Sequence, residues 1–305
     1  MKDFTGKIAF ITGGASGAGF GQAQLFGRAG CRIMIADIRQ EAIDRALDAL
    51  RAEGIEAEGI RLDITDRAAY AAAADAVEAR FGRPPHLLFN TAGVNSFGPV
   101  ELSTFGDFDW LVGVNFGGVV NGMVIFVPRM IAAGGEAHIV TVSSVGGFHG
   151  SAAAAPYCAA KAAVINLMES YHQSLAKHGI GVTVVCPANI KSNIAEATAV
   201  RPAHHGETGY LVNEETVASL HSIHIHGMDP LDLARHAKQA VEENRLYVIP
   251  YPEVAEGVRK GFDAIVAAIP PMESDAEGAR SRQEALANWA ASRTKMFSQG
   301  RETPA

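Results

Sequence analysis

The sequence is poor in cysteine and lacks any cluster of positive charge. Its 305 residues include only three cysteines, Cys31, Cys158 and Cys186, and no two of them form a C-x-x-C motif. A sparse and odd set of cysteines argues against a disulfide scaffold and fits a reducing compartment. Acidic residues outnumber basic ones by 33 to 26, without a dense basic run. The charge pattern therefore argues against binding to nucleic acid.

Long apolar runs and a secretory leader are also missing from the pattern. No uninterrupted apolar run reaches the roughly 18 residues that a bilayer span requires. Residues 1–7 lead straight into an apolar strand, without the hydrophobic region of a signal peptide. A content of 48% hydrophobic and 19% charged residues is ordinary for a globular protein. We therefore expect a soluble cytoplasmic protein that binds neither a membrane nor nucleic acid.

What the sequence does contain is an alternation of short β-branched runs and longer helical stretches, which is typical of βαβ units. Strands are predicted at residues 7–12, 32–36, 60–63, 87–90, 138–142, 182–186 and 246–249. Helices are expected to end near Ala29 and Glu53, and Asp66 is expected to cap the helix after the third strand. The predicted fold class is α/β, a Rossmann-type doubly wound structure with a seven-stranded parallel sheet.

Two segments exceed what this fold needs. Residues 187–245 separate the last two strands, and insertions at the carboxyl ends of strands in such sheets build substrate pockets. Residues 253–268 and 276–297 form two further predicted helices around a Pro-Pro break. We expect one catalytic domain at 1–252, with 187–245 as a substrate lid. Residues 253–305 are expected to be a helical extension and not an independent domain.

A glycine-rich turn lies where the first predicted strand passes into a helix. Glycines let backbone N–H groups approach a pyrophosphate, and the helix N-terminus adds positive potential. Gly13, Gly17 and Gly19 have the spacing G-x-x-x-G-x-G, which differs from the G-x-G-x-x-G of other dinucleotide folds. Asp37, which ends the second strand, can accept hydrogen bonds from both ribose hydroxyls and repels a 2′-phosphate. This favours NAD over NADP, although Arg39 could soften the preference.

Tyr157 and Lys161 share one face of a predicted helix because they are four residues apart. A free tyrosine titrates near 10, and a neighbouring cation favours the phenolate and lowers the pKa of the phenol. Such a tyrosine can act as a general acid or base near neutral pH. The pair alone is common by chance, but Ser144 adds a hydroxyl at the end of the fifth predicted strand.

Together these motifs resemble the short-chain dehydrogenase/reductases over about residues 5–250. The resemblance rests on residues 12–19 and 90–93 together with Asn115, Ser144, Tyr157 and Lys161. It implies that Tyr157 is the general acid/base and that Lys161 binds the nicotinamide ribose and lowers the tyrosine pKa. It further implies that Ser144 holds the substrate oxygen, and that Asn115 bends a helix and holds a proton-relay water.

The same resemblance implies an NAD site and no metal. The expected cofactor contacts are Gly13, Ser16, Gly17, Ala18, Gly19, Asp37, Asp63, Ile64, Asn90, Ala92, Gly93, Tyr157, Lys161, Pro187, Ile190 and Ser192. Three positions depart from the usual pattern of the family: Ala18 replaces a bulky residue, Ala188 a glycine and Ser192 a threonine. We expect these departures to affect cofactor affinity and not the chemistry.

Other conspicuous residues are better explained by packing or by a polar lid. The histidines at 204, 205, 221, 224 and 226 lack an accompanying cysteine or carboxylate cluster, which disfavours a zinc site. No sequence feature supplies a base for Cys158, so a packing role is favoured. The apolar helix over 119–130 is expected in the core or in a subunit contact. In the family this helix commonly forms a dimer seam, which implies a homodimer or homotetramer.

The lid is rich in apolar and aromatic residues, a composition that suits an aromatic alcohol, although core packing would explain many of them equally well. The candidates are Ile194, Tyr210, Leu211, Val212, Leu220, Ile223, Ile225 and Met228, with Phe97, Phe148, His149 and Tyr251 as further candidates for the pocket border.

A closer resemblance, to the bacterial Cα-dehydrogenases of lignin degradation, spans nearly the whole chain. It rests on residues 95–99, 108–110, 187–195, 219–224 and 250–253. It implies NAD-dependent oxidation of the benzylic Cα alcohol of β-aryl-ether compounds to the ketone, with a lean towards αR alcohols.

Three alternatives stay open. A hydroxysteroid or other secondary-alcohol dehydrogenase would share every catalytic residue. A non-catalytic NAD(H)-sensing regulator would use the same fold, although it would have no need of Ser144, Tyr157 and Lys161. A nucleotide-sugar epimerase would favour a different glycine spacing and a larger second domain.

Overall fold

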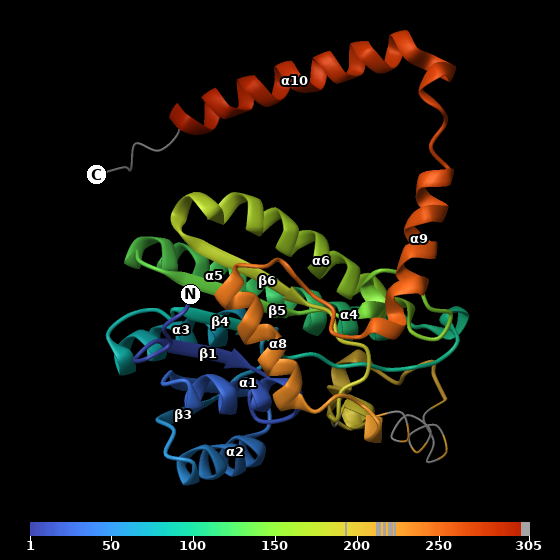
Figure 1. Cartoon of the computed structure of the whole chain (residues 1–305). Helices are drawn as coiled ribbons and strands as arrows, with labels where there is room; N and C mark the ends of the chain where they lie inside the picture. The colour runs from blue at the N-terminus through green and yellow to red at the C-terminus, as the bar shows by residue number, and fades with distance from the viewer. Residues whose placement is uncertain (193, 212–214, 216–217, 219–221, 223, 300–305) are drawn as a thin grey trace. The chain divides into compact units, whose positions relative to one another are not determined.

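Seven strands, all paired in parallel, form one sheet in the order β3-β2-β1-β4-β5-β6-β7 (Figure 1). The computed structural model describes residues 1–192, 194–211, 215, 218, 222 and 224–299. The chain divides into two units, residues 1–255 and residues 256–305. The first unit contains the whole sheet and confirms the predicted doubly wound α/β fold.

The strands lie close to their predicted positions. Their bounds are β1 Ile8–Thr12, β2 Arg32–Asp37, β3 Ala57–Arg61, β4 Leu87–Asn90, β5 Ala137–Val142, β6 Ile180–Val185 and β7 Tyr247–Val248. The third strand was predicted to close with residues 60–63, but it ends at Arg61. This edge strand pairs only with β2, and the last pair joins Asp37 to Arg61 where β2 ends. The ladder therefore stops before Leu62 and Asp63.

Helices cover both faces of the sheet and close one core cluster on each. On one face lie α1 (Gly17–Arg28), α2 (Gln40–Ala52) and α8 (Pro230–Glu243); on the other lie α3 (Arg67–Phe81), α5 (Gly118–Ala133) and α6 (Ala155–Leu175) (Figure 1). Side chains alternate between the faces along a strand, so Ile8 and Phe10 of β1 join one cluster while Ala9 and Ile11 join the other. Parallel strands covered on both faces are apolar throughout, which is why they were visible as β-branched runs.

Two helices begin directly after residues whose side chains cap them. Asp66 confirms its predicted role, since its carboxylate accepts from the N–H groups of Ala68 and Ala69 at the start of α3. At the start of α4 (Phe105–Val112), Thr104 and Asp107 form a reciprocal capping box.

Helix α4 continues through a π-helical turn, η2 (Gly113–Gly117), into α5. The combined stretch Phe105–Ala133 is long and apolar enough to cross a membrane by length and composition, and 56% of its apolar window is buried inside the fold. Core helices pass the same test. Here the buried side of α5 supplies Met123, Phe126 and Met130 to the core.

The second unit consists of helical segments. Helix α9 (Ala255–Ala267) leads into it, and η8 (Met272–Asp275) and α10 (Ala276–Gln299) follow. Among the side chains described within residues 256–292, none is buried. Phe262, Ile265 and Val266 of α9 are more than half exposed. The expectation that residues 253–305 are an extension and not a domain stays a prediction.

Candidate active site

Several positions of the turn between β1 and α1 and of the start of α1 have room for glycine only. Gly13 and Gly17 have φ values of +65° and +50°, in the left-handed region that favours glycine. A Cβ on Gly13 would lie 2.8 Å from the Cα of Ala92, and one on Gly19 would collide with the carbonyl oxygen of Gly13. The chain therefore turns tightly here, and α1 begins at the cavity wall. This arrangement offers helix N–H groups and positive potential to a pyrophosphate.

Asp37 at the end of β2 is buried, and it is paired. Arg39 donates from its Nε to Asp37 Oδ1 (3.3 Å) and from its Nη2 to the hydroxyl of Ser16 (3.0 Å). The guanidinium thus lies between the predicted ribose-binding carboxylate and the phosphate turn. A cation in this place offsets part of the charge of Asp37, and so weakens the repulsion of a 2′-phosphate that the carboxylate alone would produce.

Thr12 joins the first turn to the segment after β4. Its hydroxyl donates to the carbonyl of Phe89 (3.2 Å) and accepts from the N–H groups of Thr91 (3.0 Å) and Ala92 (3.3 Å). Asn90 lies behind this segment, where its amide donates to Thr141 of β5 (3.2 Å). That Asn90 contacts the cofactor stays a prediction. Its side chain points into the helical layer below the cavity and supports the sheet.

Asp63 and Ile64, after β3, form another part of the cavity wall. Asp63 accepts from the N–H (2.9 Å) and the hydroxyl (2.7 Å) of Thr65, which fixes its carboxylate in a local turn. The carbonyl of Ile64 accepts from Asn121 of α5 at 2.9 Å. The wall is thereby tied to the helix that packs below it.

Ser144 and Tyr157 meet at the carboxyl end of β5. Ser144 begins the short helix η3 (Val145–Gly147), where its hydroxyl accepts from the N–H of Gly146 (3.1 Å) and donates to the carbonyl of Pro187 (3.4 Å). Burial raises the pKa of Tyr157 to about 12, although a hydrogen bond with Ser144 acts to lower it. The tyrosine lies in the first turn of α6, which has a proline near its start.

Lys161 lies one helical turn further along α6. Its ammonium donates to the carbonyl of Val142 (3.0 Å) and is 5.6 Å from the centre of the Tyr157 ring. Burial lowers the pKa of Lys161 to about 8. The net shift of the Tyr157 pKa is therefore upward and not downward as the sequence predicted, because the loss of solvation of the phenolate dominates.

Asn115 is fully buried within the π-helical turn. Its amide donates to the carbonyls of Val94 (2.8 Å) and Leu111 (2.9 Å), and its Oδ1 accepts from the N–H of Val94 (3.3 Å). The predicted distortion of the helix at Asn115 is this π turn. A Cβ on Gly93 would lie 2.8 Å from Asn115 Oδ1 and 3.4 Å from Lys161 Nζ. Three predicted site residues therefore converge at this point.

All of these parts open onto one cavity of about 720 Å³. Among the described residues that the sequence predicted as catalytic or cofactor-binding, Asn90 alone does not line it. The predicted residues that line the cavity are Gly13, Ser16, Gly17, Ala18, Gly19, Asp37, Asp63, Ile64, Ala92, Gly93, Asn115, Ser144, Tyr157, Lys161, Pro187, Ile190 and Ser192. Their catalytic and cofactor-binding roles stay predictions. A cavity of this size falls within the range of about 300–1,000 Å³ that is usual for small-molecule and cofactor sites.

The predicted lid residues divide between the cavity and other places. Phe97, His149 and Ile194 line the cavity. Tyr210 is buried against Ser103 (2.6 Å between hydroxyls), and the hydroxyl of Tyr251 donates to Asn189 (2.9 Å). Phe148 and Met228 pack beside the core clusters, and Leu211 and Ile225 are exposed. Val212, Leu220 and Ile223 lie outside the described residues.

Three histidines of the lid, His204, His205 and His224, also line the cavity. His226 is exposed, and His221 lies outside the described residues. Within the described part of the chain, no group of three or more His, Cys, Asp or Glu side chains could hold a metal ion.

The cysteines are buried thiols. Burial raises the pKa of Cys31 and Cys186 to about 12 and also raises the pKa of Cys158. Such thiols stay protonated, which agrees with the packing role favoured for Cys158.

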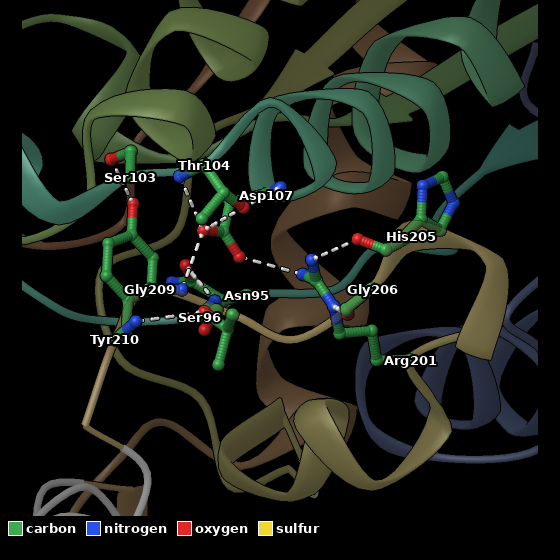
Figure 2. Close-up of polar contacts among 11 residues, drawn as sticks. Asn95, Ser96, Ser103, Thr104, Asp107, Arg201, His205, Gly206, Gly209 and Tyr210 are labelled. Atoms are coloured by element: carbon green, nitrogen blue, oxygen red, sulfur yellow. Dashed lines mark hydrogen bonds and ion pairs between the residues drawn. The ribbon is translucent and has the colours of Figure 1, made fainter.

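Sequence reasoning missed one wall of the cavity. Trp110 of α4 is buried and lines it, beneath the guanidinium of Arg201 at 5.3 Å. Arg201 forms an ion pair with Asp107 of α4 (Figure 2). The spacing of Thr104 and Asp107 is a helix-start signal that could have located α4. No comparable sequence signal indicates that Asp107 forms an ion pair with an arginine of the lid.

Comparison with known proteins agrees with this geometry. The profile of the family described as short chain dehydrogenase matches residues 7–202. A C alpha-dehydrogenase of Sphingobium sp. strain SYK-6 is 64% identical over 300 residues, which cover 98% of each chain.

Two solved structures are similar as well. The apo form of LigD from the same Sphingobium strain is 56% identical, with a TM-score of 0.76 over 88% of this chain and 100% of that one. A short chain dehydrogenase/reductase from Burkholderia phymatum, solved in complex with NAD, is 34% identical, with a TM-score of 0.83 over 89% of this chain and 98% of that one.

Proposed function

The chain belongs to the short chain dehydrogenase family, and on this premise we propose that it oxidises the benzylic Cα alcohol of lignin-derived β-aryl-ether compounds to the ketone with NAD. The observation that carries the proposal is the convergence of Ser144, Tyr157 and Lys161 on the cavity that the glycine-rich turn also lines. The full-length likeness to a C alpha-dehydrogenase supports the choice of alcohol.

The residues around the turn fit NAD. Gly13 and Gly19 leave the backbone bare where a Cβ would intrude, and the start of α1 offers N–H groups to phosphate. The carboxylate of Asp37 can accept from ribose hydroxyls, and Asp63 and Ile64 would border the adenine. When bound, NAD supplies the hydride acceptor and, in its oxidised form, a positive charge. The complex of the Burkholderia phymatum relative with NAD supports this choice of cofactor.

The chain's own residues manage the oxygen and the proton of the alcohol. Ser144 holds the alcohol oxygen with its hydroxyl, and Tyr157 removes the proton from that oxygen as the general base. Because the pKa of Tyr157 is about 12 in the free protein, the phenol is protonated near neutral pH. Positive charge near the ring, including that of protonated Lys161, favours the phenolate that the reaction requires. Asn115 and Lys161, which meet beside Gly93, lie where the proton can pass on towards solvent.

Other readings are less well supported. A dehydrogenase of steroids or of other secondary alcohols would use the same residues, but the likeness to a C alpha-dehydrogenase extends over the whole chain. A sensor of NAD(H) would have no need of the Ser144–Tyr157 hydrogen bond.

The test is a direct assay with separated enantiomers. The purified protein is incubated with NAD and with the αR or the αS form of a β-aryl-ether alcohol, and NADH is followed by its near-ultraviolet absorbance. We expect NADH to form with the αR alcohol faster than with the αS alcohol. The matching ketone serves as a control that cannot be oxidised. Activity on a steroid alcohol with none on either aryl ether would overturn the proposed substrate.

We also propose that the protein acts in the cytoplasm as a homodimer or homotetramer. Its three buried thiols suit a reducing compartment. Val124 of α5 and Phe105 of α4 are large apolar side chains that are 61% and 91% exposed, as expected of a subunit contact. Residues 253–305 would then be an extension of the catalytic domain without a core of its own.

A further inference from the structure

A buried ion pair joins the lid to helix α4. The Nη1 of Arg201 lies 2.8 Å from Asp107 Oδ1, and the two side chains are 9% and 0% exposed (Figure 2). Burial raises the pKa of Asp107, but hydrogen bonds from Thr104, Thr208 and Gly209 outweigh it and hold the pKa below its usual value. The aspartate is therefore charged, and its partner must be as well.

Both groups make further hydrogen bonds within the protein. Asp107 Oδ2 accepts from the N–H and the hydroxyl of Thr104, both at 2.9 Å, and from the N–H of Gly209 at 3.3 Å. Arg201 donates from Nε to the carbonyl of Gly206 (3.0 Å) and from Nη2 to that of His205 (3.1 Å). Removing two charges from water is costly unless their partners are this complete. The structure accordingly holds the lid backbone in one place on α4.

The lid segment that this pair anchors can be followed along the cavity. We define the strap as residues 194–205, which include η5 (Ile194–Val200) and η6 (Ala203–His205). Just before the strap, Ser192 packs closely against Gly17 of the phosphate turn. A Cβ on Gly17 would lie 3.1 Å from the Cβ of Ser192. Further on, Ala197 packs with Trp110 and Leu111 of α4.

The far end of the strap and the residues after β3 line the same cavity. Burial and the charges of His204 and Arg201 lower the pKa of His205, and the charges of Asp109 and Asp63 oppose them. His205 is thus within electrostatic reach of the residue expected at the adenine. The strap therefore runs from the phosphate turn to the adenine wall, and six of its side chains line the cavity: Ile194, Ala197, Val200, Pro202, His204 and His205.

We propose that Asp107 and Arg201 are positioning residues whose ion pair holds the strap across the dinucleotide cleft and slows the release of NADH. This inference rests on the dinucleotide part of the proposed function and is independent of the identity of the alcohol. An arginine suits this place because its three nitrogens, spread over a planar guanidinium, each donate to a different acceptor: Asp107 and two lid carbonyls. An ammonium group carries all its donors on one nitrogen and matches this spacing less well.

The test measures NADH release and strap closure separately. The chain has two tryptophans, so a Trp289→Phe background leaves Trp110 under Arg201 as the one fluorophore of this kind. In that background we compare Arg201→Lys with the parent by stopped-flow displacement of NADH and by acrylamide quenching of Trp110. The expected result is a dissociation rate for NADH that rises about tenfold, together with stronger quenching.

Two further variants make the result decisive. Arg80→Lys changes an exposed arginine of α3 that pairs with Glu56 and Glu58, and it should leave both readouts unchanged. If Arg201→Lys does not fold, the double variant Asp107→Asn with Arg201→Gln replaces the ion pair by neutral hydrogen-bonding groups and should show the same faster release.

The outcomes are distinguishable from those of the proposed function. NADH release is measured without any alcohol, so inactivity on aryl ethers would leave this inference standing. A dissociation rate that stays within twofold of the parent in a folded variant, with or without stronger Trp110 quenching, would overturn it.

Discussion

The strands of the sheet carry polar side chains at both of their ends, and these serve opposite purposes. We call the side of the sheet where the strands begin the amino edge, and the side where they end the carboxyl edge. Towards the amino edge, His86 accepts from the N–H of Ile8 (3.0 Å), and His138 shares a hydrogen bond of 2.8 Å with the hydroxyl of Thr183, which itself donates to Arg245 (2.8 Å). At the carboxyl edge, Asp37, Ser144 and Tyr157 line a cavity. One edge satisfies its polar groups within the protein, and the other presents them to small molecules.

The contrast separates stability from function on the same seven strands. A histidine buried at the amino edge stabilises the fold only while its partners are in place. A tyrosine buried at the carboxyl edge contributes to chemistry through a proton that it exchanges. Substitutions at the two edges should therefore change different measurements.

The largest effect should come from Tyr157→Phe. Loss of the phenol removes the general base, and we expect kcat for alcohol oxidation to fall about a thousandfold or more. The ring and its packing remain, so the melting temperature and the Kd for NADH, measured by fluorescence titration, should stay close to those of the parent. Turnover that survives this change would contradict the proposed chemistry.

Next in size is His138→Ala at the amino edge. It removes one of the two hydrogen-bond partners of the Thr183 hydroxyl and opens a cavity between β5 and β6, and we expect the free energy of unfolding to fall by about 2–4 kcal/mol. Urea denaturation measures this change, and kcat should remain within twofold for the folded enzyme. His178→Ala, at an exposed position in η4 (Ala176–His178), is the matched control. Equal effects of the two substitutions would show that His138 has no special role.

A smaller effect is expected for Asp37→Ala. The lost hydrogen bonds to the ribose should raise KM for NAD by about tenfold to a hundredfold. The same change frees Arg39 for a 2′-phosphate, so KM for NADP should fall. Adding Arg39→Ala to Asp37→Ala should cancel the gain with NADP. A gain that persists in the double variant would place the phosphate-binding cation elsewhere.

The smallest effect should be the change in the free energy of unfolding that one buried histidine causes over one pH unit. Burial lowers the pKa of His86 to about 4 and that of His138 to about 3, both below the unfolded value near 6.5. The unfolded chain therefore binds more protons between these values, so the stability present above pH 6.5 is lost as the pH falls. Each histidine should account for about 1.4 kcal/mol per pH unit between about pH 6 and 4. Urea titrations of the parent and of His138→Ala at several pH values measure the difference.

The rate of alcohol oxidation should change with pH in the alkaline range. Because burial raises the pKa of Tyr157 to about 12 and the reaction requires the phenolate, kcat/KM for oxidation should rise with pH from neutrality upward. Loss of the Lys161 proton, whose pKa is lowered to about 8, should make this rise less steep above that pH. A profile that stays flat from neutral to alkaline pH would contradict the assignment.

The sequence predicted the sheet because buried parallel strands are apolar throughout. Strand β4 was predicted at residues 87–90 and occupies Leu87–Asn90. The bounds of β3 were predicted less well, since an edge strand ends where its one partner ends and not where its apolar residues end. The glycine turn and the Tyr157–Lys161 pair were predictable because their geometry is local.

The features that could not be predicted depend on contacts between residues far apart in the sequence and on the burial that these contacts produce. The spacing of Tyr157 and Lys161 indicates that they are neighbours, but it says nothing about the solvent that each loses, and this reversed the expected pKa shift of the tyrosine. Asp107 and Arg201 are 94 positions apart, and they meet only because the lid folds back onto α4. Whether the side chain of Asn90 faces the cavity could not be decided without the register of β4 and β5.

The π-helical turn at Gly113–Gly117 sets the rotational phase of everything that follows it. Each residue advances a helix by about 100°, so deleting one residue of the turn would rotate α5 by that amount relative to α4. Asn121 would then leave the carbonyl of Ile64, and Met123 would leave Asn90. The number of residues in this stretch is thus as constrained as the identity of Asn115. Related sequences with a one-residue gap here should have lost both the adenine wall and the activity.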